Sequence, residues 1–143
     1  MGLSNAIVAI KGNQLENIGQ ISEILNYFED ENLINEISGA AQFKNGWTIL
    51  IDEEMVFVTE EDLLQELSEE LDTEVFSFTI QSTSATYGFS YFNKDISRVF
   101  LVQDGDIITN EGDKLIQEKD LSIDKNISKN EILKIAKKIS IDI

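Results

Sequence analysis

Carboxylates are the side chains of this sequence with the clearest capacity for chemistry, and a dense short group lies in residues 101–115, LVQDGDIITNEGDKL. Oxygen ligands grouped so closely in a loop are the kind that Ca²⁺ binds. An EF-hand loop also needs an oxygen ligand at its fifth position, a glycine at the sixth and a glutamate at the twelfth. Counted from Asp104, those positions hold Ile108, Thr109 and Leu115. The acids therefore lack calcium-loop spacing, and Asp104-Gly105 predicts a two-residue β-hairpin turn instead.

The chain contains no histidine and no cysteine. The usual general base near neutral pH, the commonest metal ligand and the thiolate nucleophile are therefore missing. The chemistry that remains is a carboxylate pair or a carboxylate-bound metal, and spacing alone selects no pair among 27 acidic residues. We expect a protein that is not an enzyme, with no catalytic residue, no metal site and no cofactor. A pocket in which three or more acids converge would favour a carboxylate-metal enzyme instead.

Negative charge is the strongest compositional feature, since 27 acidic residues against 11 basic ones give a net charge of −16. Residues 1–74 hold 17 acids and two lysines, a net −15, whereas residues 75–143 hold 10 acids and 9 basic residues, a net −1. Such a field repels nucleic acid and anionic membranes and steers the protein toward basic partners. The simpler interpretation is that acidity maintains solubility. The absence of cysteine and of any apolar run of ~18 residues leads us to expect a cytoplasmic protein.

Residues 52–74 concentrate this charge, with 11 acids in 23 positions and no lysine or arginine. Apolar spacing predicts a helix after Thr59, with an acidic first turn that suits the positive end of the helix dipole and with leucines on its buried face. The stretch is either a solvated helix face or a docking surface that mimics a polyanion and covers a basic cleft. The residues predicted to bind a partner are Asp52, Glu53, Glu54, Glu61, Asp62, Glu66 and Glu69.

The hydrophobic pattern predicts one α+β domain over residues 1–143, an antiparallel β-meander sheet with helices packed on it. Helices are predicted over residues 13–28, after Thr59 and after Ser128, where a capping box with Glu131 begins the last one. From Glu74 onward the period is two, which is typical of strands. The predicted strands are 6–10, 47–51, 55–58, 75–81, 85–92, 96–103 and 107–109, with a turn over 110–113 after the last.

Three further features have alternative interpretations. Arg98, the single arginine, lies in a predicted strand, where it would form a cross-strand ion pair or hold a ligand carboxylate or phosphate. Trp47 alternates with isoleucines and is predicted in the core. Tyr87, Phe89 and Tyr91 share one face of a strand, which would be core; exposed tyrosines there would be interface anchors.

The late part of the chain resembles small bacterial immunity proteins of polymorphic toxin systems. The resemblance covers residues 46–140 and rests on an Asn93-Lys94 turn, the arginine soon after it, and a G-x-x-L-x-x-E pattern at Gly112, Leu115 and Glu118 before a final helix. Asn93-Lys94-Asp95 lacks the glycine expected in that turn. The resemblance implies a non-catalytic protein that binds and neutralises a cognate toxin, often a nuclease, inside the producing cell.

Charge and resemblance together lead us to expect an immunity-type inhibitor that neutralises a basic toxin domain through its acidic surface. The alternative is a small regulatory or scaffold module that acts by protein–protein contact or by homodimerisation through a sheet edge. Neither expectation includes binding to nucleic acid or to a membrane, and the sequence leaves monomer and homodimer open.

Overall fold

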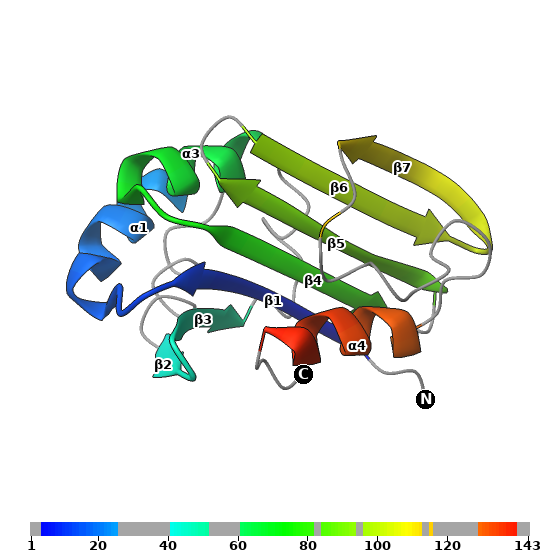
Figure 1. Ribbon diagram of the computed structural model, residues 1–143, viewed down its shortest axis with the longest axis horizontal. Coiled ribbons are helices and arrows are strands. Elements are labelled where there is room, and N and C mark those ends of the chain that lie inside the picture. The colour runs from blue at the N-terminus through cyan, green and yellow to red at the C-terminus, as the bar shows by residue number, and fades with distance from the viewer. Residues whose placement is uncertain are drawn as a thin grey trace.

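The computed structural model describes residues 4–25, 41–51, 61–81, 84–93, 96–112, 115 and 129–139. These residues form a seven-stranded sheet and three α-helices (Figure 1), so the predicted α+β class is confirmed. The strands are β1 (Ser4–Lys11), β2 (Gln42–Lys44), β3 (Trp47–Ile51), β4 (Val75–Gln81), β5 (Thr86–Asn93), β6 (Ile96–Gln103) and β7 (Asp106–Gly112). The helices are the short 3-10 helix η1 (Leu15–Asn17), α1 (Ile18–Leu25), α3 (Glu61–Leu71) and α4 (Lys129–Lys138).

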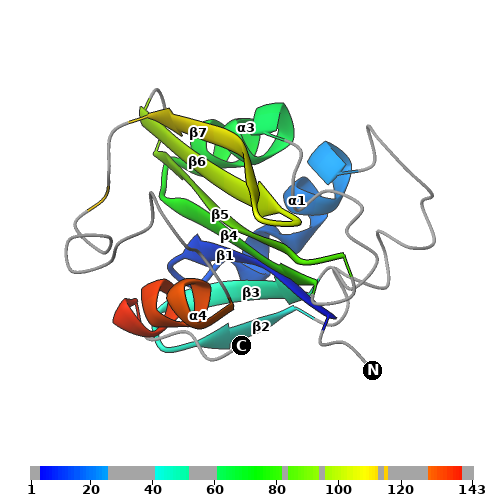
Figure 2. The same cartoon turned by 90° about the vertical axis from the view of Figure 1, so that its right-hand side faces the viewer.

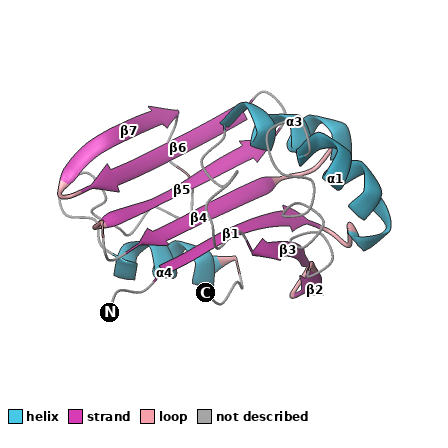
Figure 3. Cartoon of the chain, turned by 180° about the vertical axis from the view of Figure 1, so that it is seen from behind, coloured by secondary structure: helices cyan, strands magenta, loops and turns pink. Residues whose placement is uncertain are grey.

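All neighbouring strands are antiparallel, in the order β2-β3-β1-β4-β5-β6-β7 (Figure 3). The first strand of the chain lies inside the sheet, between β3 and β4. The predicted meander corresponds to β4 through β7, where each strand pairs with the next. Within the described residues, β2 and β7 form the two edges of an open sheet.

Helices cover both faces of the sheet: α1 and α3 pack together on one face, and α4 lies on the other (Figure 2). Strand alternation sends successive side chains to opposite faces. In β1, Val8 belongs to the apolar cluster under α1 and α3, and Ala9 to the cluster under α4. Trp47 is 8% exposed in the α4-side cluster, as the sequence predicts.

Two hairpin turns have the backbone geometry that their sequences indicate. Asp104 (φ 51°) and Gly105 (φ 84°) join β6 to β7, and Asn45 and Gly46 join β2 to β3 with similar angles. Two successive positive φ values are typical of a type I′ turn, which Asn-Gly and Asp-Gly favour. The turn predicted over 110–113 is wrong in its position, because β7 continues to Gly112, whose φ of 85° occurs at the end of the strand.

Several predicted features lie outside the described residues. They are the strand at 55–58, the helix start at Thr59, the capping serine at 128 and the acids Asp52, Glu53 and Glu54. The first predicted helix corresponds to η1 followed by α1, and the residues described there end at Leu25. In the part of the chain that is described, no helix has the length and apolarity needed to cross a membrane.

Candidate functional site

Helix α3 carries the acidic face that the sequence predicts. Leu63, Leu64 and Leu67 are at most 1% exposed and pack into the cluster against the sheet. The opposite side of the helix is exposed and carries Asp62, Glu66, Glu69 and Glu70, whereas the first residue, Glu61, lies at the edge nearest the sheet. The amphipathic spacing thus fixes the leucines inward and leaves a continuous row of carboxylates in solvent.

The carboxylates of α3 have no cation to neutralise them among the described residues. Glu66, Glu69 and Glu70 take part in no described ion pair, and the last turn of α3 contains no basic residue. Negative charge in the last helical turn faces the negative end of the helix dipole, which costs about 0.3–1 kcal/mol at an exposed site. The positions of Glu69 and Glu70 are therefore not explained by the stability of the helix.

One acid of the same block has a structural role. Glu74 accepts a hydrogen bond from Lys11 Nζ on Oε2 at 2.8 Å and another from the Tyr91 hydroxyl on Oε1 at 2.7 Å. Burial raises the pKa of Glu74, but these hydrogen bonds and the Lys11 charge together outweigh it and lower the pKa below 4.5. Burial and the Glu74 carboxylate raise the pKa of Tyr91 to about 12.

The two tyrosines of β5 belong to the side of the sheet that α4 covers. Tyr87 and Tyr91 are half-buried and pack against that cluster, and the Tyr91 ring lies 4.8 Å from the Phe76 ring, centroid to centroid. The interpretation of this strand face as core is confirmed. The tyrosines are not the exposed interface anchors of the alternative interpretation.

Hydroxyl side chains gather on the α3 side of the sheet, in two rows that cross four strands. The register sets Ser77 beside Ser90, then Val99 and Glu111. The neighbouring row runs Thr79, Gly88, Leu101 and Thr109. Since β4 sends Phe76, Phe78 and Ile80 to the other face, its serine and threonine share the α3 side by alternation alone.

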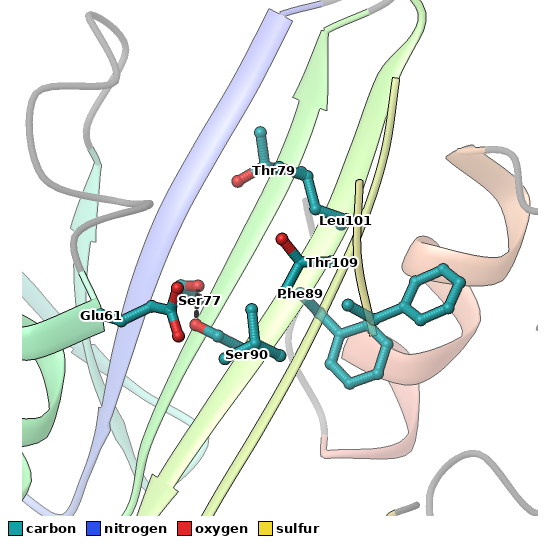
Figure 4. A pocket seen from close by; sticks show the side chains of 10 residues that line it. Glu61, Ser77, Thr79, Phe89, Ser90, Leu101 and Thr109 are labelled. Carbon is teal, nitrogen blue, oxygen red and sulfur yellow. Dashed lines mark hydrogen bonds between the residues drawn. The ribbon is translucent and has the colours of Figure 1, made fainter. Parts of the chain in front are cut away.

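These rows enclose a pocket of about 50 Å³, which we call the hydroxyl pocket, with Glu61 at its border. The Glu61 side chain extends from the start of α3 toward Ser77 and Ser90, whose hydroxyls are hydrogen-bonded to each other (Figure 4). The pocket is lined by the hydroxyl-bearing residues Ser77, Thr79, Ser90 and Thr109, by Glu61, Gly88 and Val99, and by Phe89, Phe100 and Leu101.

Thr79 carries its hydroxyl on the wall of this pocket. The residue is only 3% exposed, and its hydroxyl has no hydrogen-bond partner among the described residues. In that part of the chain no fully enclosed side-chain polar atom lacks a partner, so the Thr79 oxygen must open onto the pocket that it lines. A polar group held this way needs an outside donor or acceptor to be satisfied.

Glu61 lies in surroundings that oppose its ionisation. Its pKa is raised above 4.5, first by partial burial and then by the charges of Glu111 and Asp62. Glu111 comes from β7 at the far end of the serine row, so a carboxylate from a second element acts on Glu61 at the border of the hydroxyl pocket. The arrangement provides acceptors and negative charge for a small cationic group.

Arg98 is 1% exposed and packs on the α4 side of the sheet. Its Nη1 donates to the Asn110 side-chain oxygen at 2.6 Å and to the Glu111 carbonyl at 3.1 Å. Its guanidinium lies 5.8 Å from the Phe89 ring centroid and 5.5 Å from that of Phe100. These contacts are internal and cross-strand, and their two acceptors on β7 are neutral groups. The ion pair expected for Arg98 stays a prediction.

The acids of the β6–β7 hairpin remain apart from this pocket. Asp104 and Asp106 are exposed and border a shallow depression with Ser84 and Ile108. No group of three acidic side chains capable of holding a metal ion occurs within the described ranges. The Asp104-Gly105 stretch is a turn, as its spacing indicates.

Of the acids predicted to bind a partner, the structure brings Glu61, Asp62, Glu66 and Glu69 together on one helix. The residues that sequence reasoning missed are the hydroxyls of the pocket. A signal for them exists in β4, where the segment VFSFTIQ alternates aromatic residues with Ser77 and Thr79 although both faces of the strand are buried. Serine and threonine are mostly exposed in folded proteins, so their presence on a buried strand face indicates a role other than packing.

The chain matches no known protein-family model, and neither the curated proteins nor the solved structures include one significantly similar to it.

Proposed function

We propose that this protein is a non-catalytic binding protein that holds a basic protein partner through the exposed carboxylates of α3, as an immunity-type inhibitor does. The observation that supports it is the row of unneutralised acids on α3, which includes Glu69 and Glu70 at the unfavourable end of the helix dipole. A cationic partner would relieve both the mutual repulsion of these acids and their unfavourable position.

The mechanism is electrostatic steering followed by local docking. The acidic half of the chain increases the rate of encounter with a basic surface, and this effect weakens as salt screens the charges. Docking then depends on the few carboxylates that lose water at the interface. An inhibitor of a basic toxin needs no catalytic group of its own, because covering the toxin's cleft is sufficient.

The test compares two variants that remove the same charge from different faces. The α3 variant carries Glu66→Gln, Glu69→Gln and Glu70→Gln; the control carries Glu16→Gln, Asp104→Asn and Asp106→Asn, all at exposed positions away from α3. Tagged native protein captures partners from the cells that produce it, and the dissociation constant of each purified partner is then measured at several salt concentrations.

We expect the α3 variant to bind the partner at least tenfold more weakly and with less salt dependence, while the control binds as the native protein does. For the inhibitor function, native protein and control should restore growth of cells that express the partner, and the α3 variant should not. Equal binding by the two variants would contradict an α3 interface.

The exposed edge strand β7 favours a second candidate, a homodimerising module. Ile107 and Ile108 are 46% and 56% exposed in this strand, which ends the described sheet. An edge with free backbone groups and exposed isoleucines is a template for pairing with another strand. Sedimentation of the native protein and of Ile108→Lys tests it: a native dimer that becomes a monomer in the variant supports this candidate, and a native monomer excludes it.

A further inference from the structure

We propose that the hydroxyl pocket binds the ammonium group of a lysine side chain. The proposed function supplies only the origin of that lysine, which a basic partner would present. The binding property of the pocket depends on its own residues, and a small amine can test it without that partner.

The hydroxyl pocket is lined by several hydrogen-bond acceptors. The Thr79 hydroxyl opens onto the pocket without a partner, although its residue is 3% exposed. The Thr109 hydroxyl lines the same space and also has no partner among the described residues. Ser77 and Ser90 share one hydrogen bond, so their oxygens retain further acceptor capacity. The pocket therefore presents several oxygens to a ligand that can donate more than one hydrogen bond.

The border of the pocket is negatively charged. Glu61 borders the pocket and its carboxylate is close enough to Glu111 for the two to repel each other. A neutral ligand leaves this repulsion unchanged, whereas a cation near both carboxylates is attracted to each of them. Negative charge beside a set of hydroxyl oxygens thus selects for a positively charged donor.

The size of the pocket and the positions of its acceptors suit a compact ligand group. A pocket of about 50 Å³ has room for a compact group, because one water molecule needs roughly 10–15 Å³ by the same measure. An ammonium group has three N–H donors that point in different directions and sits on a flexible four-carbon stem. The acceptors here come from β4, β5 and β7, and the flexible lysine stem lets the three ammonium donors turn toward acceptors on separate strands.

Two other occupants are less consistent with these residues. A divalent cation needs several carboxylate or carbonyl ligands, and the described residues contain no group of three acids that could hold one. Water would satisfy the hydroxyls, but it would leave the charges of Glu61 and Glu111 without a counter-ion. A pocket filled only with water is the result that overturns the proposal.

The experiment titrates isotope-labelled native protein with n-butylammonium and follows backbone amide signals by NMR. We expect saturable shifts at Thr79, Gly88 and Thr109 in the millimolar range, and no saturable shift with n-butanol, the neutral molecule of the same length. Equal shifts with n-butanol, or no shift with either compound, would overturn the proposal. A stronger effect from n-butylguanidinium would overturn the choice of ammonium.

Variants assign the effect to the pocket. Glu61→Gln should weaken n-butylammonium binding about tenfold, since a charge-assisted hydrogen bond is lost. Glu66→Gln makes the same chemical change on the same helix away from the pocket and should bind as the native protein does. Thr79→Val keeps the side-chain shape without the hydroxyl and should also weaken binding. Unchanged affinity in both Glu61→Gln and Thr79→Val would contradict the site.

A final arm separates a protein lysine from a free amine. The probes are the peptide Gly-Gly-Lys-Gly-Gly with blocked ends and the same peptide acetylated on the lysine nitrogen. The lysine peptide should shift the same amides and the acetylated one should not. Binding of n-butylammonium without binding of the peptide would overturn the lysine assignment. Because no partner is used, failure of the α3 interface leaves this result intact, and failure of the pocket leaves the α3 interface intact.

Discussion

Replacing Gly88 with alanine should destabilise the protein, because the strand beside it leaves no room for a methyl group. A Cβ at this position would lie 2.5 Å from the Phe100 carbonyl oxygen and 2.7 Å from Leu101 Cδ1. Ordinary contact begins near 3.4 Å, so β6 must move by 0.9 Å or the ladder between β5 and β6 must distort. Overpacking of this kind costs about 1–3 kcal/mol, and loss of glycine's backbone entropy in the unfolded chain returns about 0.5–1 kcal/mol.

The net expectation is a loss of about 0–2.5 kcal/mol, with a central value of about 1 kcal/mol. With a urea m-value of about 2 kcal/mol per molar, the central value corresponds to a fall of about 0.5 M in the unfolding midpoint. Gly19→Ala is the matched control, since nothing lies within 4 Å of its added Cβ and the residue is in helix α1. Alanine is favoured over glycine in a helix by about 0.8–1.0 kcal/mol, so this midpoint should rise.

The two glycine substitutions therefore have opposite predicted signs for one chemical change. A Gly88→Ala protein that gains stability, as Gly19→Ala should, would refute the close approach of β6 to Gly88, and with it the floor of the hydroxyl pocket. A Gly19→Ala protein that loses as much stability as Gly88→Ala would show that the loss does not come from the local contact.

Three further outcomes concern residues on or beside the other face of the sheet. Asn110→Ala removes the acceptor that lies 2.6 Å from Arg98 Nη1. The free energy of unfolding in urea should fall by about 1.5–3 kcal/mol, because a buried charged donor loses a hydrogen bond. Stability equal to that of the native protein would contradict this. In ultraviolet titration, Tyr91 should ionise near pH 12, a step missing from Tyr91→Phe. A tyrosine pKa raised in the folded state makes stability fall as pH rises from 10 toward 12. The lowered pKa of Glu74 makes stability fall as pH drops below about 4.5. The free energy of unfolding, measured in urea at several acidic pH values, should show a smaller fall in Glu74→Gln than in the native protein.

The strands from Glu74 onward could be predicted because their sequence alternates with a period of two and their turns contain residues that tolerate positive φ. Asp104-Gly105 is the clearest case, since both residues adopt the left-handed backbone that a tight hairpin needs. The helix after Thr59 was predictable for a similar reason: its leucines recur at helical spacing, and they are buried as that spacing requires.

Strand order could not be predicted in the same way. Nothing local in the first strand indicates that it lies between β3 and β4, because that position depends on pairings with residues some 40 and 70 positions away. The three-residue strand β2 is also too short to have a periodicity of its own.

The hydroxyl pocket depends on register, and register follows from pairing. Thr79, Gly88 and Thr109 share one row only because β4, β5, β6 and β7 pair as they do, including an irregularity beside Leu101 in the pairing of β6 with β7. A shift of one residue in β4, β5 or β7 would send the pocket hydroxyls of that strand to the α4 side. Sequence reasoning could find the hydroxyl residues, but it could not bring them together.

The fold also converts a charge asymmetry along the chain into one in space. Helices α3 and α4 lie on opposite faces of the sheet (Figure 2). Helix α3 exposes acids, whereas α4 exposes Lys134 and Lys137. If the protein binds a basic partner as proposed, the acids of α3 attract it more strongly than the described side chains of α4 do, and this difference favours an encounter at the first face. The hydroxyl pocket borders the attractive face through Glu61, the first residue of α3. A lysine guided toward the exposed acids of α3 would therefore arrive beside the oxygens that can hold it, which links the long-range and short-range parts of the proposed interaction.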